Sequence, residues 1–373
     1  MSQYVNILPG DPAPWFHVRS ASNPRYAFDS AGGRYLVLLF FGTAADAHSR
    51  EAIEAARARP DLFDDAHASL FGVSVDPADE ADGRVAEAYP GHRLFWDFDG
   101  EVSRRYGAAP IDAAPGARGV ALRRMWVVLD PTLRVVAVVP FAADRSDVAA
   151  AIGIVAELPP PASFAGVELQ APILLLSRVF EPELCAHLIE RYEAAGGEES
   201  GVMRDVDGQT VGVMDPRHKR RKDHMLEDPG LIGEIQQRFL RRVTPEIRKV
   251  HQFEATRMER YLVACYAAED GGHFSPHRDN TTHGTAHRRF AVSINLNDDF
   301  DGGEVRFPEY GPRGFKAPVG GAVVFSCSLL HAVGRVTAGR RYAFLPFLYD
   351  EAAAKLREAN LAKVSEEYRA GAV

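Results

Sequence analysis

The stretch that decides the fold of the C-terminal half reads Phe290-Ala-Val-Ser-Ile-Asn-Leu-Asn297, Gly302-Gly-Glu-Val-Arg-Phe-Pro308 and Gly320-Gly-Ala-Val-Val-Phe325. Each segment is short and largely apolar, and Gly-Gly pairs and a proline separate one segment from the next. Several short strands divided by turn signals are typical of an antiparallel jelly roll rather than of an α/β sheet. The sequence therefore predicts an all-β core for this part of the chain.

Two histidines and an aspartate flank these predicted strands. His277-Arg-Asp279 lies before them in a polar stretch rich in Gly and His, and His331 follows the last of them. Two imidazoles and one carboxylate on a single face form the ligand set that holds Fe(II) and leaves three coordination positions open. A His-x-Asp tripeptide alone is weak evidence in a chain with 13 histidines, so the prediction depends on the order of these residues along the chain. Three further histidines of the same loop are expected to be loop or substrate-side residues: His273, His283 and His287.

Residues 175–350 resemble the 2-oxoglutarate and Fe(II)-dependent dioxygenases, specifically the prolyl 4-hydroxylase branch. The resemblance implies a double-stranded β-helix, which is a jelly roll, with bracing helices outside it. It also implies that His277, Asp279 and His331 bind the iron. In that family a basic residue shortly beyond the distal histidine binds the far carboxylate of the cosubstrate, and here that residue is Arg341.

The resemblance supplies two more positions of the cosubstrate pocket. Tyr266, in Ala-Cys-Tyr, matches a tyrosine that reaches into the pocket, although taken singly it is equally consistent with an ordinary strand aromatic. Asn295 stands where many relatives have a tyrosine. The smaller amide is expected to widen the pocket or to bind the carboxylate through a different hydrogen bond. Arg340, beside Arg341, is expected to be a surface or salt-bridge arginine.

The resemblance also implies the reaction. Fe(II), 2-oxoglutarate and O2 would hydroxylate a C–H bond of a prolyl or other amino-acid residue or of a small metabolite, and the cosubstrate would leave as succinate and CO2. Ascorbate is an optional reductant in such a scheme. A permanently charged, planar arginine suits bidentate binding of a carboxylate. Halogenating relatives replace the iron-binding carboxylate with a small residue, so Asp279 favours hydroxylation.

The first half of the chain has a different pattern. An apolar run of strand length, Tyr35 to Phe41, is followed by further predicted strands at Leu70 to Asp76 and Met125 to Asp130. Ala- and Arg-rich segments at 45–59 and 79–88 are predicted helices. Strands that alternate with helices indicate an α/β layer fold.

This half resembles a peroxiredoxin of the thioredoxin-like fold. The resemblance rests on Gly-Asp-Pro-Ala-Pro at 10–14, Phe-Phe-Gly-Thr at 40–43, Phe95-Trp-Asp-Phe-Asp-Gly-Glu101, and Arg124 ahead of Trp-Val-Val-Leu-Asp130. The family's peroxidatic cysteine lies just after Phe-Phe, but residues 42–50 contain no cysteine and the first one in the chain is Cys185. A thiolate is the nucleophile of that chemistry. We therefore predict that the domain is catalytically inactive and that Arg124 is a relic or a structural residue.

A proline-rich segment, Glu157-Leu-Pro-Pro-Pro-Ala-Ser163, separates the two halves. Such a segment is stiff and extended, and it suits a domain boundary. We predict a peroxiredoxin-like domain at 1–157, a linker at 158–166 and a dioxygenase domain at 167–373. A chain of 373 residues with 46% hydrophobic content is long enough for two packed cores.

Helices are predicted around the second core. A strand beginning at Leu174 is followed by an amphipathic helix that runs to Tyr192, and residues 229–247 are expected to form another helix. The second helix would place Leu231, Ile232, Ile235, Phe239 and Leu240 on one side. The Ala-, Glu- and Lys-rich segment from Glu351 to Ala370 has helical spacing and would pack on the core or mediate a homodimer.

Charge and cysteine content limit the partners and the location. A net charge of −8 argues against general nucleic-acid affinity. The longest apolar run is too short to span a bilayer, and no charged region followed by a hydrophobic stretch begins the sequence. Three cysteines without a CxxC spacing favour a reducing cytoplasm, where Cys265 and Cys327 would be core thiols.

One local exception to the acidic composition is the basic cluster Arg217-His-Lys-Arg-Arg-Lys222. It is either a solvated loop or a segment that captures an acidic peptide or an anionic metabolite.

Two other functions remain open from the sequence. One is a scaffold in which both domains have lost catalysis and the histidines share this spacing by chance, and the intact ligand set with Arg341 argues against it. The other is a peroxidase that works without cysteine, against which the missing thiol argues. The substrate is not encoded in any motif, because specificity in this fold resides in variable loops.

Overall fold

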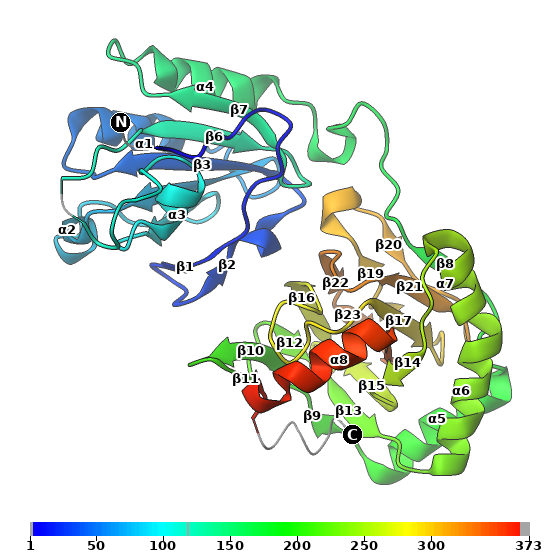
Figure 1. Ribbon diagram of the computed structural model, residues 1–373. Coiled ribbons are helices and arrows are strands. Elements are labelled where there is room, and N and C mark those ends of the chain that lie inside the picture. The colour runs from blue at the N-terminus through cyan, green and yellow to red at the C-terminus, as the bar shows by residue number, and fades with distance from the viewer. Residues whose placement is uncertain (1–2, 118, 366–373) are drawn as a thin grey trace. The chain divides into compact units, whose positions relative to one another are not determined.

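The computed structural model describes residues 3–117 and 119–365, and it contains two compact units. One comprises Met1–Gln170 with Pro308–Pro312, and the other comprises Ala171–Phe307 with Arg313–Val373. Figure 1 draws both units with their elements labelled. The predicted linker, residues 158–166, lies within the first unit, so the exact domain limits stay a prediction.

The first unit is built on one sheet with the strand order β2-β1-β5-β4-β3-β6-β7 in its described residues. The strands β3, β4 and β5 are parallel, and β6 and β7 are antiparallel to their neighbours. The strands are β1 His17–Ser20, β2 Tyr26–Ala27, β3 Tyr35–Gly42, β4 Ala68–Ser74, β5 His92–Trp96, β6 Met125–Leu129 and β7 Val135–Pro140. The helices are α1 Ala47–Arg57, α2 Pro77–Ala81, α3 Glu101–Arg105 and α4 Ser146–Glu157, with 3-10 turns η1 Phe28–Ala31 and η2 Pro161–Ser163.

The sheet of the first unit is buried on both faces, as the continuous apolar run in β3 requires. Alternate residues of β3 point to opposite faces. Tyr35 and Val37 belong to a core that includes residues of α1 and α4, and Leu36 and Leu38 belong to the core on the other face. The predicted α/β, thioredoxin-like fold is therefore confirmed.

One helix of the first unit was wrongly predicted. The segment 79–88 was expected to be helical, but α2 ends at Ala81 and the following residues form turns and irregular chain. Gly83 has a φ of +61°, a conformation that interrupts a helix. Composition alone favoured a helix because the glycine stands in an otherwise helix-forming context.

The second unit consists of antiparallel strands, and among its described residues the two largest sheets have five and nine strands. The smaller sheet has the order β12-β16-β22-β19-β20, formed by Lys219–Arg220, His273–His277, His331–Val333, Val305–Arg306 and Gly314–Phe315. The larger sheet contains β14 Arg257–Glu259, β25 Phe347–Tyr349, β17 Phe290–Asn295, β24 Arg340–Phe344, β15 Leu262–Ala267, β13 Lys222–Met225 and β9 Glu198–Glu199, with β21 Ala322–Ser326 and β8 Leu174–Leu176 beside β17. Two ribbons complete the strands: β10 Val202–Val206 with β11 Gln209–Val213, and β18 Asp301–Gly302 with β23 Val336–Ala338. The predicted jelly-roll fold is confirmed.

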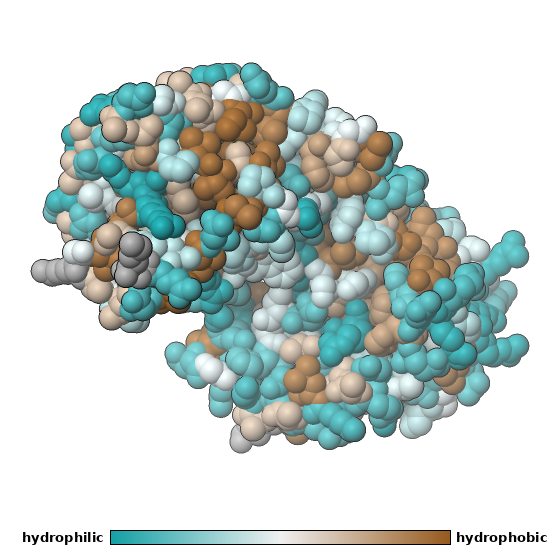
Figure 2. All heavy atoms as spheres, turned by 45° about the horizontal axis from the view of Figure 1, so that its top comes forward, coloured by the Kyte–Doolittle hydropathy of each residue, from teal (hydrophilic) through white to brown (hydrophobic). Residues whose placement is uncertain are grey.

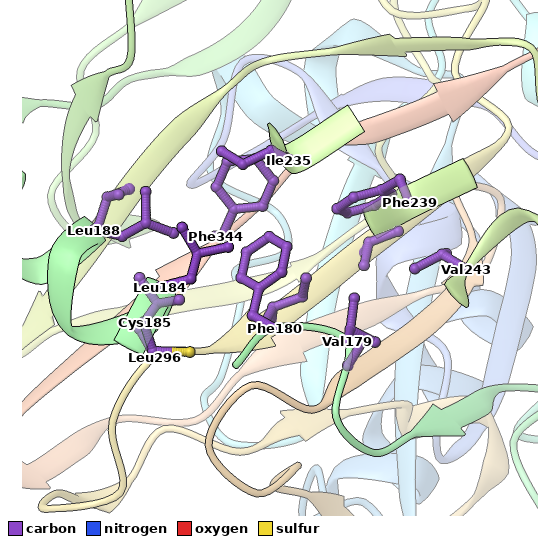
Figure 3. Packing of buried hydrophobic residues seen from close by; sticks show 14 of the residues in the cluster. Val179, Phe180, Leu184, Cys185, Leu188, Ile235, Phe239, Val243, Leu296 and Phe344 are labelled. Carbon is purple, nitrogen blue, oxygen red and sulfur yellow. The ribbon is translucent and has the colours of Figure 1, made fainter. Parts of the chain in front are cut away.

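Helices pack against the larger sheet, as predicted for the bracing elements. They are α5 Pro182–Ala195, α6 Pro229–Arg242 and α7 Thr244–His251, and the chain later forms the 3-10 turn η3 Pro308–Tyr310, α8 Glu351–Asn360 and η4 Leu361–Lys363. Figure 3 shows how Leu184 and Leu188 of α5 and Ile235 and Phe239 of α6 gather around Phe344 of the sheet. Burial of these side chains holds the helices on the outside of the jelly roll.

The single helix predicted over 229–247 is in fact two helices. Helix α6 ends at Arg242, and α7 begins at Thr244 with Pro245 in its first turn. Proline lacks the N–H that a continuous helix would need there. Of the apolar stripe, Leu231, Ile235 and Phe239 are buried, but Leu240 is exposed.

The C-terminal segment forms a shorter helix than predicted among the described residues. The helix predicted from Glu351 to Ala370 is α8 over Glu351–Asn360, and residues 366–370 lie outside the described residues. Among the described residues, no helix has the length and apolar character needed to cross a membrane. The face in Figure 2 is mainly hydrophilic, with hydrophobic residues in separate groups. All three cysteines are free and buried.

Candidate functional site

The three residues predicted to bind iron come together in the second unit. One ligand atom from each of His277, Asp279 and His331 can be chosen so that all lie within 4.8 Å of one another. His277 Nε2 lies 3.5 Å from Asp279 Oδ1, and His331 Nε2 lies 3.3 Å from Asp279 Oδ2. The side chains are largely buried, with His331 only 5% exposed. The three side chains predicted from the sequence therefore lie in one cluster.

Sheet pairing fixes the two histidines. His277 ends β16, His331 begins β22, and the two residues are cross-strand partners in the smaller sheet. The Nδ1 atom of His277 bonds to Ser275 O at 2.8 Å, and that of His331 bonds to Leu329 O at 3.0 Å. A carbonyl oxygen only accepts, so each Nδ1 carries the proton and each Nε2 presents a lone pair to the cluster.

An aromatic ring and a backbone bond hold the cluster further. The ring of Phe274 stacks on His277 with a centroid separation of 3.5 Å and an interplanar angle of 18°. The backbone N–H of Asp279 donates to Cys327 O at 3.0 Å, which ties the loop after β16 to the end of β21. Both contacts limit the rotation of the ligand side chains, as the outer shell of a metal site does.

Burial and neighbouring groups keep these side chains in the protonation states that suit metal binding. Burial, together with the nearby His331, lowers the pKa of His277 to about 4. Burial alone would raise the pKa of Asp279, but His331, His277 and Arg288 outweigh it and hold that pKa well below its ordinary value. A neutral imidazole beside an ionised carboxylate is the form in which these groups act as ligands.

Arg341 is fully enclosed in the interior of the larger sheet, with 2% of its surface exposed. Its Nε donates to Asn295 Oδ1 at 3.0 Å and its Nη2 donates to Ser293 Oγ at 2.7 Å. Its Nη1 is buried and has no hydrogen-bond partner among the described residues. A buried guanidinium nitrogen without a hydrogen-bond acceptor lowers the stability of the fold. An anionic or polar group from outside the chain would supply that acceptor.

Tyr266 and Asn295 both lie beside Arg341. Tyr266 is its cross-strand partner on β15, with the Arg341 Cζ atom 5.4 Å from the ring centroid. Asn295, on β17, accepts from Arg341 and donates its Nδ2 hydrogen to Ala317 O at 2.7 Å. Both amide atoms of Asn295 thus have protein partners, and the amide holds the guanidinium in place.

The other residues that the sequence analysis considered near the site have partners outside this cluster. Arg340 is exposed and forms a salt bridge with Glu269 at 2.5 Å, as expected. His283 pairs with Asp205 at 2.9 Å. The remaining two histidines of the loop are also engaged elsewhere: His273 contacts Gly271 O and Arg217 O, and His287 contacts Glu259.

The burial of two cationic side chains near the cluster was not predicted from the sequence. Lys219 is 7% exposed and Arg221 is 6% exposed. Arg221 Nη1 donates to the hydroxyl of Tyr266 at 3.4 Å. No signal in the sequence identifies them, because residues 217–222 contain no apolar residue that would mark an inward face.

The segment 42–50 of the first unit contains no cysteine. Arg124 Nη1 forms an ion pair with Asp46, and its contact with Ser49 Oγ is 3.4 Å long. Asp46 also caps α1 by accepting from Ser49 N. Ser49 Oγ in turn donates to Phe41 O at 2.9 Å. The arginine is therefore engaged by a carboxylate at the start of α1 instead of facing a thiol.

The geometry of the second unit fits a metal ion together with an organic anion. Three groups with lone pairs face one another in a buried space, and a divalent cation between them would relieve their repulsion. Two nitrogens and one carboxylate are the donors that suit Fe(II) with open positions. Nη1 of Arg341 is the matching donor for a carboxylate.

Family comparison agrees with both halves of this description. Residues 261–349 match the family model of the 2OG-Fe(II) oxygenase superfamily, and residues 9–138 match that of the AhpC/TSA family. The first match contains the whole cluster and Arg341, and the second contains Arg124.

Among curated proteins, a PKHD-type hydroxylase of Synechococcus sp. (strain JA-3-3Ab) is 32% identical over 89 residues, which are 22% of this chain and 39% of that protein. The PKHD-type hydroxylase of Stutzerimonas stutzeri (strain A1501) is 26% identical over 180 residues, or 46% of this chain and 75% of that protein. The chain thus spans 39% of the length of the Synechococcus relative.

Solved structures resemble each half separately. A prolyl hydroxylase of Trichoplax adhaerens, in complex with a hypoxia inducible factor peptide fragment, is 17% identical with a TM-score of 0.40, covering 50% of this chain and 86% of that one. The peroxidoxin BcpB of Mycobacterium tuberculosis is 22% identical with a TM-score of 0.33, covering 40% of this chain and 96% of that one.

Proposed function

Because residues 261–349 match the family model of the 2OG-Fe(II) oxygenase superfamily, we propose that this chain is a hydroxylase that uses Fe(II), 2-oxoglutarate and O2. The overall change is R–H + 2-oxoglutarate + O2 → R–OH + succinate + CO2. The iron, once bound with its cosubstrate, supplies the oxidising chemistry. The observation that carries the proposal is the convergence of His277, Asp279 and His331 within 4.8 Å.

The residues of the chain have separate tasks in this proposal. His277, Asp279 and His331 hold the metal on one face and leave the other face open. Arg341 binds the far carboxylate of 2-oxoglutarate through its unpaired Nη1, and Asn295 and Ser293 fix the guanidinium plane. Tyr266 lies alongside and supplies its hydroxyl to the same pocket.

We also propose a substrate that carries a prolyl or other amino-acid residue, either in a peptide or as a small molecule, and ascorbate as a reductant. Three free, buried thiols suit a reducing cytoplasm. The domain limits that we propose are 1–157 and 167–373, joined by the linker at 158–166. A homodimer through the C-terminal helix remains a prediction from the sequence.

Binding of the cosubstrate to iron can be observed directly. Under anaerobic conditions, we expect the full-length protein to bind one iron per chain and to develop a visible charge-transfer band when 2-oxoglutarate is added. The band requires a 2-oxo acid chelated to Fe(II), so a spectrophotometric titration measures both events. Absence of the band at saturating iron and cosubstrate would leave the scaffold as the better explanation.

A second test concerns the first unit. We expect hydrogen peroxide, given with a thiol reductant, to be consumed no faster than in buffer, because residues 42–50 contain no cysteine and Arg124 is paired with Asp46. The matched control is the Cys185→Ser, Cys265→Ser, Cys327→Ser triple variant. Rapid peroxide turnover that persists in this variant would show that the domain is an active peroxidase without cysteine.

A further inference from the structure

The basic cluster at 217–222 is divided between the interior and the surface of the second unit. Its chain crosses from one sheet to the other, since β12 pairs with β16 and β13 pairs with β15. Lys219 and Arg221 are buried, whereas Arg220 is exposed and Lys222 is half-exposed. Arg220 donates a hydrogen bond to the backbone oxygen of Asp270, and Lys222 forms an ion pair with the carboxylate of Asp270. Alternation along an extended chain thus turns two cations inward at the junction of the sheets.

Arg221 lies beside the pocket proposed for 2-oxoglutarate. Its Nη1 donates to Tyr266 Oη at 3.4 Å, and its Nη2 donates to Asp223 Oδ2 at 2.6 Å. Its Nε is buried and has no hydrogen-bond partner among the described residues. As with Arg341, a donor of a buried guanidinium remains available for a group that the chain does not provide.

Lys219 lies next to Arg221 on the side of the metal cluster. Its Nζ donates to Ser200 Oγ at 2.6 Å and to Gly201 O at 2.8 Å. Arg221 Nη2 reaches the same Ser200 Oγ at 3.3 Å, so the two cations are close neighbours. Lys219 Nζ also lies 5.1 Å from the ring centre of Phe274, and the same ring stacks on His277.

The charges of this group do not balance. Among the described residues, the ion pairs of Arg221 and Arg260 both end on Asp223, and Lys219 has no ion pair of its own. Asp279 attracts Lys219 electrostatically, but in the proposed function that carboxylate is committed to the metal. The buried Lys219 and Arg221 and the partly exposed Arg260 therefore lie near one carboxylate, and this excess of positive charge favours the binding of a further anion.

The cosubstrate does not supply the missing charge. One carboxylate of 2-oxoglutarate would bind the metal, and the other would bind Arg341, which has its own unpaired Nη1. The excess positive charge at Lys219 and Arg221 then remains beside Tyr266 and near the metal cluster.

We propose that Lys219 and Arg221 form a carboxylate-binding site, and that the substrate of the hydroxylase presents a carboxylate to it. The inference rests on the proposed function, because it assumes that metal and cosubstrate occupy the neighbouring positions. Arg221 would bind the carboxylate through Nε, and the Lys219 ammonium would add its charge. Tyr266, which contacts both Arg221 and Arg341, lies between the two anions.

The test uses the full-length protein with Mn(II) and N-oxalylglycine, an analogue of 2-oxoglutarate that is not decarboxylated. With both positions filled, calorimetry measures the binding of two matched pairs of probes. One pair is N-acetyl-Pro-Glu-amide and N-acetyl-Pro-Gln-amide, which tests an acidic side chain of a peptide. The other is N-acetyl-proline and its primary amide, which tests the free carboxylate of a small molecule.

We expect the acid of at least one pair to bind about tenfold or more tightly than its amide, since a charge-assisted pair is lost in the amide. Arg221→Gln and Lys219→Met should each remove this preference. Arg220→Gln and Lys222→Gln, the outward neighbours on the same chain, should keep it to within about twofold. The pair that shows the preference identifies the source of the carboxylate.

The binding of N-oxalylglycine separates this inference from the proposed function. If the analogue does not bind the manganese-loaded protein, the proposed function itself is wrong. If it binds but no acid is preferred over its amide, only the carboxylate site is wrong. If Arg221→Gln chiefly weakens N-oxalylglycine, Arg221 belongs to the cosubstrate pocket and the proposal is overturned.

Discussion

Replacing His277 or Asp279 with alanine is expected to abolish iron binding and the charge-transfer band with 2-oxoglutarate. In the proposed site each residue would provide one of three protein ligands, and the remaining two donors would not hold Fe(II) against water and buffer. Removal of Asp279 also deletes the negative charge that lies 3.3 Å from His331 Nε2 and 3.5 Å from His277 Nε2. Equilibrium dialysis with iron and the anaerobic spectrum measure the two losses.

His283→Ala is the matched control for this experiment. His283 lies a few residues beyond Asp279 in the sequence, but it pairs with Asp205 at 2.9 Å and does not belong to the cluster. We expect its variant to bind iron and to give the band as the unmodified protein does. An Asp279→Ala variant that retained both properties would mean that the metal lies elsewhere.

Arg341→Ala is expected to raise the concentration of 2-oxoglutarate needed for half-maximal succinate formation by about thirtyfold or more. Loss of one partner of a buried, hydrogen-bonded charge pair costs about 2 to 5 kcal/mol, part of which comes from the unpaired partner. The guanidinium does not touch the metal cluster, so iron affinity should be nearly unchanged. Iron binding in the same samples also shows whether the variant is folded.

Arg340→Ala is the control because Arg340 is the next residue on β24 but points outward to Glu269. Its substitution should have little effect on the cosubstrate requirement. A larger effect at Arg340 than at Arg341 would contradict the assignment of the inward residue. If neither change matters, the pocket does not take 2-oxoglutarate.

The cluster of His277, Asp279 and His331 could be predicted because the order of these residues along the chain, followed by Arg341, resembles that of a known family. The fold then pairs His277 with His331 and Tyr266 with Arg341 across neighbouring strands. The irregularity of β16 between Phe274 and His277 could not be predicted from the alternation of a strand.

The burial of Lys219 and Arg221 could not be predicted in the same way. Five basic residues within six positions are normally solvated, and the pattern 217–222 has no apolar residue to mark an inward face. Only the pairing of β12 and β13 with two different sheets defines which residues point inward. Tertiary pairing, not local composition, sets their burial.

The role of Asn295 also depends on tertiary contacts that the sequence does not show. The sequence placed it in the cosubstrate pocket, but its neighbours Arg341 and Ala317 come from distant parts of the chain. Whether an amide binds a ligand or orients an arginine depends on which partners reach it. Its expected role as a direct carboxylate ligand thus stays a prediction, and its contacts favour orientation.

In the proposed function, the pairing of His277 with His331 would also link iron binding to the stability of the fold. The ligands are held by a sheet that exists only in the folded state, so iron would bind the native form and draw the folding equilibrium toward it. A free metal concentration about 100 times the dissociation constant would add about 2.7 kcal/mol to the free energy of unfolding. The iron-free chain would then be the less stable form and the one more readily degraded by proteases.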